Sequence, residues 1–138
     1  MHLRLSGERI PAELLELLAA LTDGARLRHA DVTHDPQSRE VRLPITRFPL
    51  LKRRRLLPNV RDRQTPIISV VTVRNVVTCE IENSVPADLG HEVQLLFGLQ
   101  VRDRRVYISS AEEDRGHTCF SVTLQLSELD IEIADSTV

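Results

Sequence analysis

The chain contains 138 residues, of which 41% are hydrophobic, and its formal net charge is −2 at pH 7. A chain of this length can bury a core of its own, so we expect residues 1–138 to fold as a single domain that needs no disulfide or metal. Aromatic residues make up only 3% and Trp is absent, which argues against a single-strand nucleic-acid platform, and the acidic balance argues against general nucleic-acid binding.

The N-terminal part of the chain predicts a strand and then a helix. Alternating leucines indicate a short strand over residues 2–6. An amphipathic helix is expected from Pro11 to Thr22, since Pro11 suits a first helical turn and Asp23-Gly24 suits a helix end. The leucines of its apolar face are Leu14, Leu15, Leu17, Leu18 and Leu21.

A hairpin is predicted around residues 35–38, because Asp35-Pro36-Gln37-Ser38 has the pattern of a type I turn. With Pro36 and Gln37 at its centre, Val32 would face Val41 across the two strands. Pro44 cannot donate a ladder hydrogen bond, so the second strand is expected at an edge of the sheet.

Residues 67–82 alternate as one long strand, with a first half that is apolar on both faces. That half should be covered on both sides, and the leucine-rich helix is the expected cover. We therefore expect residues 67–73 to be among the most buried. The residues predicted to share the inward face are Val71, Val73, Val77, Cys79 and Ile81.

The C-terminal third predicts an antiparallel meander. A two-residue turn at Asp103-Arg104 would pair Val101 with Val106, and a later loop would bring Ile108 opposite Phe120. The inward phase slips once near residues 127–128, which indicates either a tight turn or a bulge. The first strand's inward residues are expected to be Val93, Leu95, Phe97, Leu99 and Val101.

These elements predict an α+β fold that is mainly antiparallel β. We expect seven to eight strands forming a roll or a partly open barrel, with one N-terminal amphipathic helix on a face. The connection over residues 48–66 is long for a compact domain, and such connections are usually functional or disordered.

The connection over residues 48–66 also carries the main functional signal. From Arg47 to Arg63 there are seven basic residues against one acidic residue, about +6, so the rest of the chain sums to about −8. Arginine side chains bind phosphates and carboxylates through forked hydrogen bonds. The residues predicted to bind an anion or a partner are Lys52, Arg53, Arg54, Arg55, Arg61 and Arg63.

Several partners fit this basic segment. It could be a solvated loop, or it could bind acidic side chains of its own chain, of another protein or of a sister subunit in a homo-oligomer. A small anionic ligand, such as a phosphorylated molecule, is the next alternative. Flanking leucines at 50, 51, 56 and 57 also allow membrane contact, although no apolar run is long enough to span a bilayer.

Catalytic candidates are weaker. Glu80, Glu82, Asp130 and Glu132 share outward parity, and with the acidic loop at 112–114 they could support acid–base chemistry or hold a hard cation. A solvated face is the favoured explanation of these carboxylates. No phosphate-binding, dinucleotide-binding or nucleophile-elbow motif is present, so we expect no cofactor and favour a non-enzymatic function.

Histidine and cysteine form one pair that could be reactive. His117 and Cys119 lie two apart on a predicted strand and should both point outward, as should His29 on its own strand. A metal site needs three or four converging ligands, so no metal is expected. Because Cys79 has inward parity, we expect no disulfide, and we expect Cys119 to react with a thiol reagent before Cys79 does.

The remaining signals concern location and role. The N-terminus lacks the apolar stretch of a secretory signal, and two cysteines suit a reducing compartment, so the cytoplasm is expected. Seventeen arginines and one lysine suggest a GC-rich, bacterial coding sequence. The leading hypothesis is a non-catalytic binding or assembly module that presents the basic segment to an acidic partner. The alternatives are a sensor of a small phosphorylated ligand and, below it, an enzyme that uses outward carboxylates or the His117–Cys119 pair.

Overall fold

The computed structural model describes residues 1–48, 66–84, 92–111 and 118–136. Within these ranges the chain forms one α-helix, one 3₁₀ turn and ten strands. In chain order the elements are β1 (His2–Gly7), α1 (Ala12–Thr22), β2 (Arg26–Arg28), η1 (His29–Asp31), β3 (Thr33–Asp35), β4 (Glu40–Arg47), β5 (Ile67–Val73), β6 (Val76–Asn83), β7 (Glu92–Arg102), β8 (Arg105–Ala111), β9 (Thr118–Leu126) and β10 (Leu129–Asp135).

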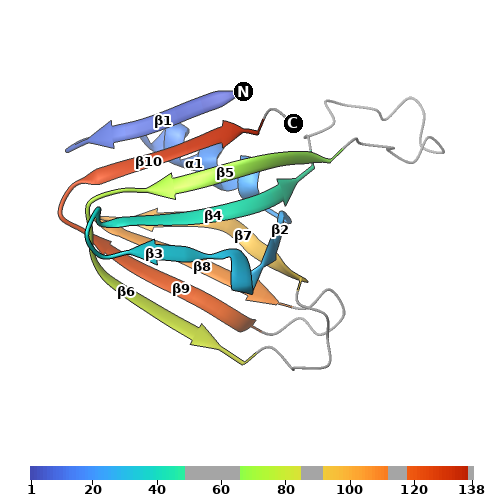
Figure 1. The fold of residues 1–138 in the computed structure, drawn as a ribbon. Coiled ribbons are helices and arrows are strands. Elements are labelled where there is room, and N and C mark those ends of the chain that lie inside the picture. The colour runs from blue at the N-terminus through green and yellow to red at the C-terminus, as the bar shows by residue number, and fades with distance from the viewer. Residues whose placement is uncertain (49–65, 85–91, 112–117, 137–138) are drawn as a thin grey trace, which may run out of the picture.

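All the strands belong to one antiparallel sheet that curls around the core (Figure 1). The strand order is β1-β10-β5-β4-β2-β7-β8-β9-β6, and β3 pairs with β4 beside this path. The sheet is open, since β1 and β6 form its two margins. The α+β antiparallel class is confirmed, but the sheet has ten strands rather than seven or eight, because β2 pairs as a separate strand and the strand predicted over 67–82 is split into β5 and β6.

The predicted N-terminal strand and helix are both present as β1 and α1. Leu18 turns into the core at 1% exposure, and the helix packs on β7. The helix approaches β7 closely at Gly98, where the Thr22 hydroxyl donates to Leu18 O and accepts from Leu99 N. No helix in the described ranges is long and apolar enough to cross a membrane.

The single long strand predicted over 67–82 is wrong. The chain breaks at Arg74 and Asn75, and the two halves become β5 and β6. Asn75 has a φ of 60°, a left-handed conformation that Asn tolerates better than most residues. β5 lies between β10 and β4. β6 instead pairs with β9 and forms the margin of the sheet at the other end of the strand order from β1.

β5 is fully buried on one face and only partly buried on the other, where Thr72 is 7% exposed. Ser69, Val71 and Val73 are fully buried, but Ile68 is 49% exposed on the other face. The expected cover is absent from that face because α1 packs on β7 and buries Leu18 in the core, on the inner face of the sheet.

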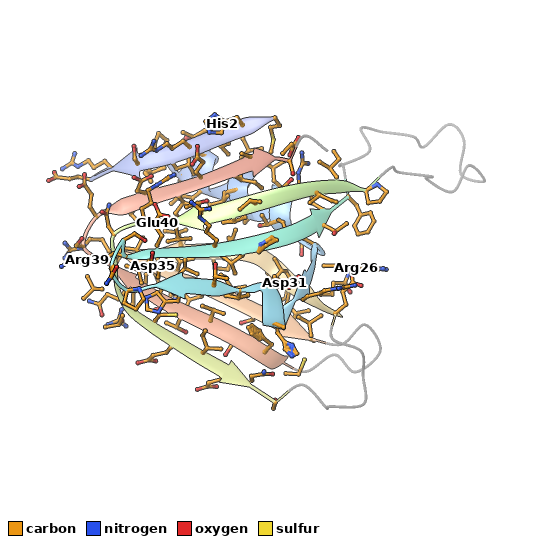
Figure 2. All side chains as sticks on the ribbon, in the orientation of Figure 1. His2, Arg26, Asp31, Asp35, Arg39 and Glu40 are labelled. Carbon is orange, nitrogen blue, oxygen red and sulfur yellow. The ribbon has the colours of Figure 1, made fainter. Side chains whose placement is uncertain are left out.

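The hairpin between β3 and β4 is shifted from its predicted register. His34, not Val32, pairs with Val41, because the turn spans four residues and ends at Arg39, whose φ is 57°. Figure 2 shows Arg39 at this turn.

The edge position predicted from Pro44 is also wrong. β4 is an internal strand, with β5 on one side and β2 and β3 on the other. Pro44 lies between the residues of β4 that pair with β2 and those that pair with β3. The sheet therefore tolerates the backbone N–H that proline lacks.

In the meander, the pairing of Val101 with Val106 is confirmed, while Ile108 pairs with Val122 instead of Phe120. Phe97 points outward at 74% exposure, because a bulge between Leu96 and Leu99 reverses its phase. Residues 127–128 form a turn, not a bulge, and it links two strands that do not pair with each other.

The outward orientation predicted for Cys119 is wrong, whereas Cys79 has the predicted inward parity and packs against the core. Both thiols are free. Cys119 is only 6% exposed because it lies at a bulge, where Phe120 pairs with Ser110 but Thr118 pairs with Ala111. Cys79 lies on the margin strand β6 and is partly exposed. Burial raises the pKa of the Cys79 thiol, but that thiol remains the accessible one.

We therefore expect a thiol reagent to label Cys79 before Cys119 in the native protein, and both equally in urea. Access of the reagent to the sulfur sets this order. Mass spectrometry of tryptic peptides along a labelling time course measures it. Faster native labelling of Cys119 would contradict the burial at the β8–β9 bulge.

Candidate functional site

The six basic residues predicted to bind a partner, between Lys52 and Arg63, lie outside the described residues. The paired ends of β4 and β5, which flank these residues in the sequence, are described, and the pairing extends to Arg47 and Ile67. We call these paired strand ends the stem. Arg47 itself belongs to the stem, where it is 5% exposed. Residues 52–63 therefore keep six basic residues and one acidic residue, about +5, and the rest of the chain sums to about −7.

Arg47 is held by a compact polar cluster. Its Nη2 lies 2.9 Å from an Asp135 carboxylate oxygen, and its Nε donates to the Ser69 hydroxyl at 3.0 Å. The amino group of Met1 also binds Asp135, at 2.9 Å. Partial burial alone would raise the pKa of Asp135, but hydrogen bonds from the N-terminus, Arg47 and Ser69 lower it to about 2. The stem therefore joins β4, β5, β10 and the N-terminus through a carboxylate that stays ionised at neutral pH.

Apolar groups lie next to this stem. Phe48 is 36% exposed and stacks beneath Arg26, whose guanidinium carbon lies 5.5 Å from the ring centroid. Figure 2 shows Arg26 at the same end of the sheet. Ile68, on β5, is also exposed there.

The sequence did not predict which connections between strands lie at the same end of the sheet as Arg47 and Ile67. Arg26 pairs with both Thr46 and Gln94, and Gln94 pairs with Ala111. The ends of the strands that flank 49–65, 85–91 and 112–117 therefore all lie at one end, as Figure 1 also shows. We call it the stem end. The acidic residues at 112–114 lie outside the described residues, but their flanking strands start from the stem end too.

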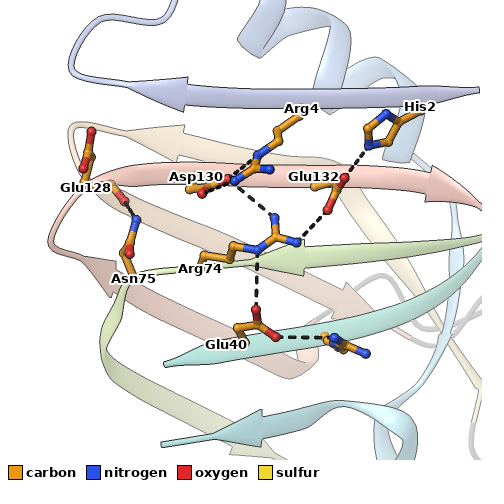
Figure 3. A network of polar contacts seen from close by, with 9 residues as sticks. His2, Arg4, Glu40, Arg74, Asn75, Glu128, Asp130 and Glu132 are labelled. Carbon is orange, nitrogen blue, oxygen red and sulfur yellow. Dashed lines mark hydrogen bonds and ion pairs between the residues drawn. The ribbon is translucent and has the colours of Figure 1, made fainter. Parts of the chain in front are cut away.

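A second feature is an arginine–carboxylate network on the outer face of β1, β10, β5 and β4 (Figure 3). Arg74 is its centre, with Nη2 2.7 Å from Glu132 and Nε 3.4 Å from Glu40. Its Nη1 lies 3.6 Å from the Asp130 carboxylate. Asp130 also accepts bidentate hydrogen bonds from the Arg4 guanidinium, at 2.9 and 3.1 Å. These contacts bind the β1 margin to the interior of the sheet.

This network argues against Glu132 as a general acid. Hydrogen bonds from His2 and Arg74 lower the pKa of Glu132 to about 2. Glu132 is therefore ionised at neutral pH, whereas a general acid must be protonated there. The outward set also does not converge, because Glu80 and Glu82 lie on β6 at the opposite margin from β10.

Among the described residues, the histidine and cysteine candidates do not come together in a site. His29 packs its ring against Phe120, with centroids 5.8 Å apart, and Cys119 is buried. His117 lies outside the described residues. Within the part of the chain that is described, no three His, Cys, Asp or Glu side chains are placed to hold a metal ion.

A depression of about 740 Å³ lies at the end of the sheet opposite the stem end. It forms where the end of β1 meets the β7–β8 and β9–β10 turns, and its charged lining residues are Glu8, Asp103, Arg104 and Glu128. No sequence pattern indicated it, because these turns are far apart along the chain. Its mixed charges form no acid–base or nucleophile pair, so the depression adds no catalytic candidate.

Comparisons with known proteins do not assign a family. No family model matches the chain, and neither curated proteins nor solved structures give a match. The function is therefore inferred from the residues and geometry of this chain.

Proposed function

We propose that this protein is a non-catalytic binding or assembly module whose basic segment, residues 52–63, contacts an acidic protein surface. That surface belongs to a partner or to a sister subunit. The observation that supports the proposal best is the stem. β4 and β5 are paired up to Arg47 and Ile67, and the buried Arg47 joins them to β10, so the connection that contains the segment leaves and re-enters the sheet at two adjacent positions.

The pairing of the other charges supports the same function. Asp130, Glu132 and Asp135 already have arginine partners within the sheet. These three carboxylates therefore do not need the basic segment for neutralisation, which supports other acidic groups as the partners of its formal charge of about +5.

The experiment compares wild type with a variant in which Arg53, Arg54 and Arg55 are changed to Ser. If the segment makes electrostatic contacts, wild-type protein should self-associate or bind poly-L-glutamate, and both should weaken with salt because charges are screened over about 8 Å at 0.15 M. The variant should bind more weakly but unfold at the same temperature, since exposed charges contribute little to folding. Light scattering and fluorescence anisotropy across a salt series measure this.

A matched control changes Arg102, Arg104 and Arg105 to Ser. It removes the same charge at the β7–β8 hairpin, opposite the stem end, and should leave binding close to that of wild type. Substitution of the leucines at 50, 51, 56 and 57 tests for apolar contact. A protein that stays monomeric and binds poly-L-glutamate equally in both arginine variants would overturn the proposal.

A further inference from the structure

The margin strand β6 offers a second interaction surface, its open backbone edge, which is distinct from the paired ends of β4 and β5. It pairs with β9 through Thr78–Asn83, and no described strand lies on its other side (Figure 1). The backbone N–H of Val76 donates to Arg39 O at 3.0 Å. The open stretch of the margin therefore runs over Val77–Glu82.

On the inner face of this stretch, apolar side chains at the edge of the core remain partly exposed. Ile81 pairs with Val122, and Cys79 pairs with Leu124. Val122 and Leu124 are fully buried, whereas Ile81 is 47% exposed. An additional strand beside β6 would place its inward side chains over Ile81 and Cys79.

The outer face of β6 is acidic and unneutralised. Glu80 and Glu82 are exposed there, opposite Thr123 and Ser121. Neither glutamate forms an ion pair with a described residue, whereas Asp130 and Glu132 on β10 are both bound by arginine. β6 contains no basic residue at all.

The two margins therefore differ in how they are protected. Natural edge strands are usually protected by lysine, proline, inward charges or a covering segment. β1 carries Arg4 and His2, which are bound to β10. The open part of β6 has no lysine, proline or inward charge, and its one irregularity lies at its start, between Val76 and Thr78.

We infer that β6 accepts an extended peptide of a partner protein as an added strand, with apolar and basic side chains alternating along it. Residues opposite each other on paired strands share a face. The apolar side chains would therefore cover Ile81 and Cys79, and the basic ones would lie beside Glu80 and Glu82. A second copy of β6 fits less well, because it would bring four glutamates onto one face.

The test uses a fluorescent peptide of about eight residues, a typical strand length, in which Arg and Val alternate. Two control peptides separate the contributions: one has the same composition in two blocks, and one alternates Glu and Val. We expect the alternating Arg-Val peptide to bind at least about tenfold more tightly than either control. Backbone amide NMR shifts should concentrate in Val77–Glu82.

Protein variants test the two faces separately. Changing Glu80 and Glu82 to Lys should weaken binding at least about tenfold, since the charges then repel the peptide. Changing Glu13 and Glu16, exposed on α1, to Lys makes the same change in net charge and should have little effect. Ile81→Thr keeps a β-branched side chain but removes apolar contact, and it should weaken binding without altering the unfolding midpoint.

Three results would overturn the inference. Equal binding of the block peptide would mean unspecific charge attraction. An equal loss of affinity in the α1 control variant would have the same meaning. Failure of the peptide to bind, together with self-association that the Glu80/Glu82 variant changes, would assign β6 to a second copy of the chain. The variants in these measurements change β6 and α1 and leave residues 52–63 as they are, so the inference is tested separately from the proposed function.

Discussion

Gly98→Ala should destabilise the protein by about 2–5 kcal/mol. Gly98 has a φ of +68°, and an added Cβ would lie 2.1 Å from Ala19 O and 2.6 Å from the Thr22 hydroxyl. The first contact is with helix backbone, so it cannot be relieved by a side-chain rotation. Either α1 moves away from β7, or the bulge rearranges and the Leu99 N–Thr22 bond is lost. Urea unfolding followed by circular dichroism measures the change.

Gly7→Ala provides the matched control for backbone strain. Gly7 also has a positive φ, +115°, but nothing lies within 4 Å of the position that an added Cβ would occupy. Its substitution should therefore cost only the strain of the backbone, about 1–3 kcal/mol. If Gly98→Ala costs no more than Gly7→Ala, the close approach of α1 to β7 is wrong.

The sequence predicted side-chain phase better than it predicted pairing. Alternation placed Val71, Val73 and Val106 inward, and all three are fully buried. Phase is a local property, since successive side chains of any strand point to opposite faces. Which strands meet depends on contacts between distant segments, so alternation did not predict the ten-strand order. The shift at His34–Val41 has a local cause, the longer turn between β3 and β4.

Two corrections have local causes that the sequence concealed. The alternation runs through Arg74-Asn75 without a Gly or Pro, so the break between β5 and β6 left only one sign, the tolerance of Asn for a positive φ. Phe97 continues an inward pattern but precedes Gly98, and glycine inside a strand often marks a bulge.

The candidate surfaces differ in how far the sequence could reveal them. The basic segment is visible in the sequence because its charges are contiguous. The network around Arg74 is not, because its partners Glu40, Asp130 and Glu132 are dozens of residues away and meet only when β4, β5 and β10 pair. The exposure of Ile81 could not be predicted either, since its inward parity is correct and only the position of β6 at a margin leaves it uncovered.

Val71→Asp should cost about 4–5 kcal/mol, which is a large part of the 5–15 kcal/mol that stabilises a typical domain. Val71 is fully buried on β5 and is paired with Leu43 on one side and Ile133 on the other. All three side chains belong to the core cluster. A carboxylate there has no basic partner, so it must either be buried as a charge or be protonated, and both are unfavourable.

Ile68→Asp on the same strand is the control. Ile68 lies on the opposite face and is 49% exposed, so an aspartate there reaches water and should change stability by less than about 1 kcal/mol. Chemical unfolding of both variants measures the difference. Burial raises the pKa of the introduced carboxyl in the folded Val71→Asp protein, and a protonated carboxyl costs less to bury than an ionised one. The deficit of Val71→Asp should therefore shrink as the pH falls toward 5, while Ile68→Asp should stay close to wild type. Equal losses of stability in the two variants would contradict the difference in burial between Val71 and Ile68.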